Sequence, residues 1–224
     1  MTTPQSDDSF SLDIIRVGAQ PRDDGAFDVA IDTTRGMIPG LLHPHEGGTG
    51  AVVWVSGAIG GVDGPAKKVY ATLAAELATQ GITSLRLNYR MPGELEECVL
   101  DTLAGVSLLK GIGAERIALV GHSFGGAVVI TAGGLSDAVS AVVAMSSQTF
   151  GATGAGKLSP RPLLVLHGDE DALLPYTNAE AIYEWAGQPK EVRLLRGGGH
   201  GLGECAEEVR SVLREWLLKH LAAE

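Results

Sequence analysis

Gly121-His122-Ser123-Phe124-Gly125 is the stretch of sequence that decides the fold. It follows a short apolar run at 117–120, typical of a strand, and precedes an apolar run at 127–130 that fits a buried helix. A G-x-S-x-G sequence between a strand and a helix predicts a sharp, strained turn that exposes the serine oxygen at the top of a sheet. Glycine suits both ends of this turn because side chains there would crowd it. The alternative interpretation is an ordinary glycine-rich turn between a strand and a helix.

Two later segments place polar residues directly after predicted strands. The apolar run at 163–166 leads into His167 and Gly168, and three carboxylates follow at 169–171. The short run at 191–195 is followed by the glycine-rich turn 197–201, which carries His200. Because ligands and chemistry gather beyond the carboxyl ends of parallel strands, we expect Ser123, one of these carboxylates and His200 to converge. Serine, acid and histidine in this chain order are the set that makes a serine hydroxyl nucleophilic.

On these motifs the chain resembles the α/β-hydrolase superfamily, and within it the small serine hydrolases related to dienelactone hydrolases and carboxylesterases. The resemblance runs from about Val29 to the C-terminal helix, and the Gly-His-Ser-Phe-Gly-Gly and His-Gly-x-x-Asp motifs are its most specific parts. It implies an α/β fold with a mostly parallel central sheet, helices on both faces, an antiparallel N-terminal edge and no cap domain. Dienelactone hydrolases carry cysteine as the nucleophile, whereas this chain has Ser123, which favours a serine esterase.

The resemblance also implies a role for each candidate site residue. Ser123 is expected to be the nucleophile, His200 the general base and acid, and Asp171 the carboxylate that orients the imidazole. Asp169 is the rival for the acid, and a hydrogen bond within its loop is its alternative role. The backbone amide of Phe124 is expected to stabilise the oxyanion. The second donor is expected from the loop 56–61, with Ala58 as the first candidate and Ile59 as the second.

The remaining histidines are expected to be structural. His122 should point away from the nucleophile and support a loop, and His167 should pack beneath the acid loop. His220 is expected to face solvent. His43 and His45 flank Pro44 in a predicted loop without a cluster of carboxylates or cysteines, so we expect no metal site there.

Composition limits the class of protein. The chain has 224 residues, 45% of them hydrophobic, and a formal charge of −10, which fits one domain at 11–224 after a loose tail at 1–10. An acidic surface argues against nucleic acid and anionic membranes as partners. The N-terminus lacks the pattern of a signal peptide, so a cytoplasmic location is expected. Cys98 and Cys205 are expected to be reduced thiols in helices, and no metal or cofactor is expected.

Strand-like and helix-like segments alternate from residue 51 onwards, which predicts a mostly parallel sheet. The connection 146–161 is too short for a lid, and the small residues at 151–156 are expected to form a pliant rim. Predicted strands are 12–17, 26–31, 36–43, 51–55, 82–87, 117–120, 139–145, 163–167 and 191–195. Predicted helices start at Pro65 and Glu94, follow Ser123, and cover 179–186 and 204–220.

The sequence therefore predicts a hydrolase of small carboxylic esters or thioesters. Two alternatives with the same catalytic residues remain, an acyltransferase and a peptidase, because the choice of acceptor depends on the pocket. A non-catalytic receptor for a small ligand and a protein-binding scaffold are the alternatives from other classes. Candidate pocket residues are Ile59, Val62, Met91, Phe124, Phe150 and Leu174.

Overall fold

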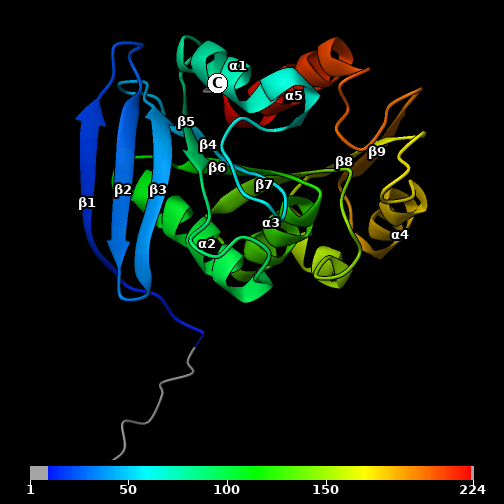
Figure 1. Cartoon of the computed structure of the whole chain (residues 1–224), viewed down its shortest axis with the longest axis horizontal. Helices are drawn as coiled ribbons and strands as arrows, with labels where there is room; N and C mark the ends of the chain where they lie inside the picture. Colours follow the sequence, from blue (N-terminus) through cyan, green and yellow to red (C-terminus); the bar gives the residue numbers. More distant parts are fainter. Residues whose placement is uncertain (1–9, 223–224) are drawn as a thin grey trace, which may run out of the picture.

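A nine-stranded sheet forms the centre of the molecule (Figure 1). The computed structural model describes residues 10–222, so most of the predicted tail at 1–10 lies outside the described residues. The strands are β1 (Ile14–Pro21), β2 (Phe27–Thr33), β3 (Gly36–His43), β4 (Gly50–Val55), β5 (Ile82–Leu87), β6 (Arg116–His122), β7 (Val139–Met145), β8 (Leu163–Gly168) and β9 (Lys190–Leu195).

The sheet is parallel from β5 to β9 and antiparallel at its N-terminal edge. Its strand order is β1-β2-β3-β5-β4-β6-β7-β8-β9, and β3 pairs with β5 in the antiparallel sense. Every residue of β4, β5 and β8 is buried, as expected for parallel strands covered on both faces. The carboxyl ends of the six parallel strands therefore share one edge, where the loops after β4, β6, β8 and β9 meet.

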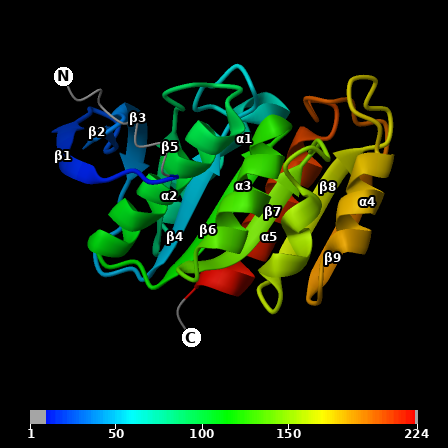
Figure 2. The same cartoon turned by 90° about the horizontal axis from the view of Figure 1, so that it is seen from below.

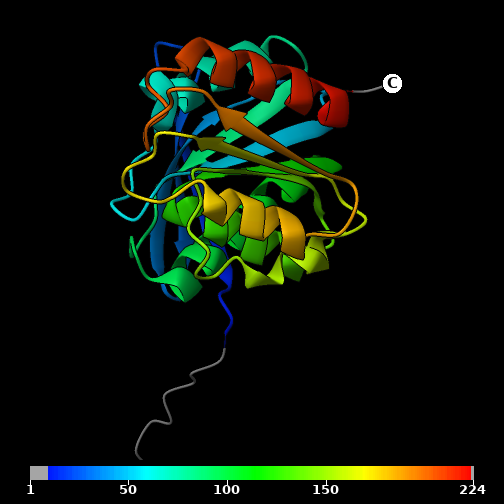
Figure 3. The same ribbon diagram turned by 90° about the vertical axis from the view of Figure 1, so that its right-hand side faces the viewer.

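Helices cover both faces of the sheet (Figures 1 and 2). α1 and α5 lie on one face, and α2, α3, α4 and the short 3₁₀-helix η1 lie on the other. In Figure 3, α5 and α4 are seen on opposite sides of β8 and β9. The helices are α1 (Pro65–Ala78), α2 (Leu95–Gly111), α3 (Phe124–Leu135), η1 (Thr153–Leu158), α4 (Thr177–Trp185) and α5 (Ala206–Leu221).

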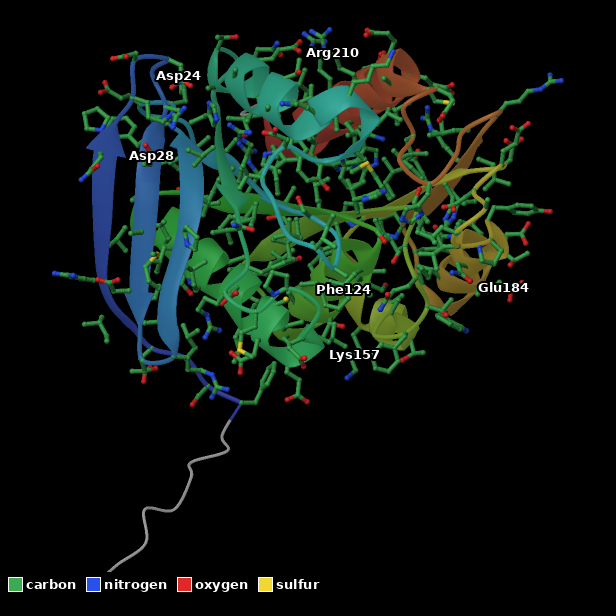
Figure 4. The ribbon with its side chains drawn as sticks, viewed as in Figure 1. Asp24, Asp28, Phe124, Lys157, Glu184 and Arg210 are labelled. Carbon is green, nitrogen blue, oxygen red and sulfur yellow. The ribbon has the colours of Figure 1, made fainter. Side chains whose placement is uncertain are left out.

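The two faces have separate apolar cores. Trp54 of β4 packs on Tyr70 of α1 with ring centroids 5.0 Å apart, and both side chains are fully buried. On the other face Phe124, at the start of α3, meets Tyr89 edge-on at 6.3 Å. Figure 4 shows Phe124 on the same side of the sheet as Lys157 of η1, and Arg210 of α5 on the opposite side. Burial on both faces holds the strand ends that carry the candidate site in fixed positions.

Most predicted segments differ from the structure by one or two residues at an end, and two differ more. β1 is observed at Ile14–Pro21 rather than 12–17, because its pairing with β2 continues to Pro21 opposite Phe27. The small residues at 151–156 do not form a pliant rim. They lead into η1, where Ala152, Ala155 and Leu158 are buried against the core that α3 and α4 share.

The start of α1 also differs from a regular helix. Pro65 is its first residue, as predicted, but Ala66, Lys67 and Lys68 have φ values of 49°, 56° and 69°. This turn is therefore left-handed, a conformation that costs a non-glycine residue roughly 1–2 kcal/mol. The Ala66 amide donates to the Gly201 carbonyl at 2.8 Å, which ties the strained turn to the loop that carries His200.

Candidate active site

Ser123 lies in a strained turn between β6 and α3. Its φ and ψ are 58° and −120°, a backbone conformation that residues with a side chain rarely adopt. A Cβ atom on Gly121 would overlap the carbonyl oxygen of Gly125, and one on Gly125 would overlap the carbonyl oxygen of Ser56. The structure thus confirms the predicted steric need for both glycines. The turn holds the serine side chain at the carboxyl edge of the sheet.

The structure brings the three predicted side chains into one hydrogen-bonded chain. His200 Nε2 lies 3.0 Å from Ser123 Oγ, although 77 positions separate the two residues. His200 Nδ1 lies 2.8 Å from Asp171 Oδ2, across 29 positions. Asp171 follows β8 and His200 follows β9, so the convergence arises because the carboxyl ends of parallel strands share an edge. With a proton on Nδ1, Nε2 is free to accept the serine proton.

The Asp171 carboxylate accepts hydrogen bonds from three partners and has no exposed surface. Oδ1 accepts the backbone amides of Leu173 at 2.9 Å and Leu174 at 2.8 Å. Oδ2 faces His200 Nδ1 and, at 3.2 Å, His167 Nε2. Burial alone would raise the pKa of Asp171, but the hydrogen bonds from Leu174, His200 and Leu173 outweigh it and lower the pKa. The group is therefore a charged acceptor at neutral pH.

Asp169, the rival acid, has a different place. Its Oδ1 accepts the Gly197 amide at 2.6 Å, which links the loop after β8 to the turn after β9. This is the loop hydrogen bond that the sequence offered as its alternative role. Asp169 therefore supports the turn that carries His200, and Asp171 accepts the hydrogen bond from the imidazole.

Two more histidines support the same loops. His122 Nε2 lies 2.9 Å from the His200 carbonyl oxygen, and burial lowers the pKa of His122 to about 4. His167 is fully buried, with Nε2 3.0 Å from the Leu174 carbonyl oxygen, and burial lowers its pKa too. Both are neutral near pH 7, and both support loops, as the sequence predicts. His122 does not lie away from Ser123 as expected, because its ring centroid is 5.0 Å from that of His200 and it lines the same cavity. His220 differs from the prediction, because it is half-buried and stacks on Trp216 at 4.4 Å.

The loop after β4 approaches Ser123 from the other side. A Cβ atom on Gly57 would lie 3.5 Å from the Cβ of Ser123, so the backbone passes close to Ser123. The Gly60 amide donates to the Gly57 carbonyl at 3.0 Å, which makes a tight turn around Ala58 and Ile59. These are the two residues predicted as second oxyanion donors. Phe124 begins α3, so its amide lies at the positive end of a helix dipole.

Side chains of β5 and its following residue anchor this loop, a role that the sequence analysis missed. Asn88 Oδ1 accepts the Gly61 amide at 2.8 Å. Arg86 donates to the Val62 carbonyl at 3.3 Å and to Asp63 Oδ1 at 3.2 Å. The sequence signal was a charged arginine at position 86, inside a predicted strand.

A cavity of about 700 Å³ opens beside Ser123 and His200. Of the predicted pocket residues, Ile59 and Val62 line it, whereas Met91, Phe124, Phe150 and Leu174 do not. Leu173 lines it in place of Leu174, because the Leu174 carbonyl oxygen faces His167. The lining residues are Ser56, Gly57, Ala58, Ile59, Gly60, Gly61, Val62, Asp63, Gly64, Pro65, His122, Ser123, Leu173, His200 and Gly201.

Metal sites and membrane-spanning helices are absent from residues 10–222. No group of three or more His, Cys, Asp or Glu side chains in this part of the chain is arranged to hold a metal ion. None of the helices in this part has the length and apolar character needed to cross a membrane. Cys98 is buried in α2, Cys205 is half-buried just before α5, and both are free thiols.

Sequence comparisons find distant relatives. No family model matches the chain. Over 126 residues it is 29% identical to the uncharacterized protein YfhR of Escherichia coli K12, a match that covers 45% of this chain and 44% of that protein. YfhR of Salmonella typhi is 24% identical over 205 residues, with 73% of this chain and 68% of that protein covered. The chain thus spans less than half the length of the Escherichia coli relative that it matches.

Solved structures with the same architecture are hydrolases. A dienelactone hydrolase from Anabaena variabilis superposes with a TM-score of 0.76 at 16% identity, covering 91% of this chain and 99% of that one. Est1E from Butyrivibrio proteoclasticus has a TM-score of 0.76 at 17% identity, with 88% and 99% covered. A serine hydrolase homologue from Coxiella burnetii has a TM-score of 0.70 at 22% identity, with 85% and 96% covered. The chain therefore has the α/β-hydrolase fold, as the sequence predicts.

Proposed function

We propose that this protein is a serine hydrolase that cleaves small carboxylic esters or thioesters through an acyl-enzyme on Ser123. The observation that carries the proposal is the hydrogen-bonded chain from Ser123 Oγ through His200 to Asp171, which borders an open cavity. The esterases and the dienelactone hydrolase among the structural neighbours support the same class. Within that class, a serine at the nucleophile position favours the esterase branch.

Acylation begins when Ser123 Oγ attacks the carbonyl carbon of the substrate and its proton moves to His200 Nε2. The charged Asp171 carboxylate stabilises the imidazolium through Nδ1. The negative charge that develops on the carbonyl oxygen is held by the Phe124 amide and by a second amide from Ala58 or Ile59. Loss of one such donor typically costs about 3–4 kcal/mol of transition-state stabilisation.

The tetrahedral intermediate then collapses and the bond to the leaving group breaks. His200 gives its proton to the departing alkoxide or thiolate, and the acyl group stays on Ser123 as an ester. A water molecule attacks this ester while His200 Nε2 takes its proton, and the acid leaves as Ser123 regains a hydrogen. This sequence needs no group from outside the chain other than substrate and water.

Replacement of Ser123 by alanine tests the proposal. Hydrolysis of p-nitrophenyl acetate and butyrate is expected to fall by at least about 10³-fold in Ser123→Ala. The control is Ser211→Ala, which removes an exposed hydroxyl on α5 and should keep full turnover. A fluorophosphonate probe should add one mass increment to the wild type and none to Ser123→Ala. Turnover in Ser123→Ala equal to that of the wild type would end the proposal.

A further inference from the structure

The cavity beside Ser123 has an apolar mouth. Ile59 and Leu173 line it together with Ser123 and His200, and these two large apolar side chains are 97% and 70% exposed. They belong to different loops, since Ile59 follows β4 and Leu173 follows β8. Exposed apolar surface at a cavity mouth marks a place where a ligand is bound. An apolar substrate group lying between Ser123 and these side chains would shield Ile59 and Leu173 from water.

The charged group in the cavity lining is already paired. Asp63 is the one acidic side chain among its lining residues, and the lining contains no lysine or arginine. The Asp63 carboxylate is already paired, with Oδ1 3.2 Å from Arg86 Nη1 and Oδ2 3.2 Å from Lys68 Nζ. A carboxylate on the substrate would therefore find Arg86 and Lys68 already paired with Asp63. No counter-ion is left for it in the lining.

Resting on the proposed function, we propose that the substrates are uncharged esters or thioesters with an apolar substituent that packs against Ile59 and Leu173. Esters that carry a carboxylate find no free cation there, because Asp63 pairs with both Arg86 and Lys68. The cavity of about 700 Å³ falls within the range that encloses a small organic ligand. Residues 57–61 form much of the wall, so shape and apolar contact select the substrate.

The first experiment measures how kcat/KM depends on the length of the acyl chain and of the alcohol chain of the ester. p-Nitrophenyl acetate, butyrate and hexanoate vary the acyl side, and ethyl, butyl and hexyl acetates vary the alcohol side. For the side that contacts Ile59 and Leu173, kcat/KM should rise by about two- to fourfold per methylene. Ile59→Ser and Leu173→Ser should each lower kcat/KM for the longest ester of that series about tenfold, and for the shortest ester less than twofold.

Leu135→Ser is the matched control for this experiment. Leu135 ends α3 and is 53% exposed, and it is absent from the cavity lining. This variant should keep the chain-length dependence of the wild type in both series. If both series are flat in the wild type, or if their slopes survive in Ile59→Ser and Leu173→Ser, the apolar contact is refuted.

The second experiment tests the charge. Wild-type enzyme should prefer p-nitrophenyl hexanoate over the p-nitrophenyl monoester of adipic acid. Asp63→Asn leaves Arg86 and Lys68 without their shared carboxylate, so the adipate-to-hexanoate ratio of kcat/KM should rise roughly tenfold at low salt and shrink in 0.5 M NaCl. Asp137→Asn, which makes the same charge change at an exposed position after α3, should leave the ratio unchanged. A ratio in Asp63→Asn equal to that in the wild type would refute the charge selection.

The outcomes also separate this inference from the proposed function. Labelling of Ser123 by a fluorophosphonate and turnover of p-nitrophenyl acetate depend on the proposed catalytic residues and not on the contacts of Ile59, Leu173 and Asp63. If labelling and turnover are observed but the chain-length and charge selectivities are absent, the proposed substrate class is wrong, and the proposal of a serine hydrolase is unaffected. If both are absent in folded wild-type protein, the proposed function itself has failed.

Discussion

Replacement of Asp171 by asparagine probes the proposed catalytic chain most directly. Asparagine has the shape of aspartate but offers one acceptor and one donor group. If its oxygen still accepts the hydrogen bonds of the Leu173 and Leu174 amides, its NH₂ group faces His200 Nδ1. The imidazole must then accept at Nδ1 and carry its hydrogen on Nε2, so it cannot take the proton of Ser123.

The reverse orientation is costly. Turning the amide would restore an acceptor for His200 but would aim NH₂ at the two backbone amides, leaving both donors without the Asp171 acceptor. Each unpaired group costs about 1–3 kcal/mol, so the unproductive orientation is favoured by about 2–6 kcal/mol. A fixed wrong tautomer lowers kcat by about 10⁴-fold in enzymes with this arrangement, which corresponds to about 5 kcal/mol.

The assay is steady-state hydrolysis of p-nitrophenyl butyrate, with thermal melting to show that Asp171→Asn is folded. Asp169→Asn is the matched control, because its amide oxygen can still accept the Gly197 amide, and its kcat should stay within about threefold of wild type. A folded Asp171→Asn with kcat within tenfold of wild type would refute the assignment of Asp171. A larger loss of kcat in Asp169→Asn than in Asp171→Asn would assign the role of the acid to Asp169.

Three further predictions follow from the same loops. Gly121→Ala places a Cβ atom on the Gly125 carbonyl, so the free energy of unfolding in urea should fall by about 3 kcal/mol or more, and an unchanged midpoint would contradict this. Burial holds the pKa of His122 at about 4, below its unfolded value of about 6.5, so protons bind the unfolded state first as pH falls through this window. Between pH 7 and 4.5 wild type should therefore lose about 2–3 kcal/mol more unfolding free energy than His122→Gln, and parallel pH curves would disprove it. Asn88→Ala removes the acceptor of the Gly61 amide and should lower kcat about tenfold with KM within threefold, whereas a change in KM alone would exclude a role in positioning the loop.

Local signals predicted the elements that depend on local sequence. β5 and β7 are observed at the predicted residues. β7 is a mostly apolar run, and β5 has apolar residues at both ends and follows Gly81. The convergence of Ser123, Asp171 and His200 was predictable for a related reason. Each follows a strand of the same parallel sheet, so the order of the motifs along the chain already places them on one edge.

Tertiary packing decided the segments that were predicted wrongly. The run of small residues at 151–156 suggested a pliant rim, yet small side chains are what allow η1 to lie close to α3. A Cβ atom on Gly133 would come within 2.8 Å of a Leu158 methyl, which shows how tightly these helices approach. His220 was expected in solvent, but the neighbouring turn of α5 offers Trp216 for stacking. Neither contact leaves a periodic signal in the sequence.

The cavity wall was the least predictable part of the site, because it is largely backbone. Gly57, Gly60, Gly61 and Gly64 leave the loop after β4 with few side chains of its own, so its position is set by groups elsewhere. The contacts that hold it are the Asn88 acceptor, the Arg86 donors and the Tyr70 hydroxyl, which donates to the Val55 carbonyl at 3.0 Å. In the sequence these residues look like parts of a strand and a helix. Their effect on the proposed chemistry is exerted through the backbone amides beside Ser123, so substitutions there should change the rate constant more than the affinity for substrate.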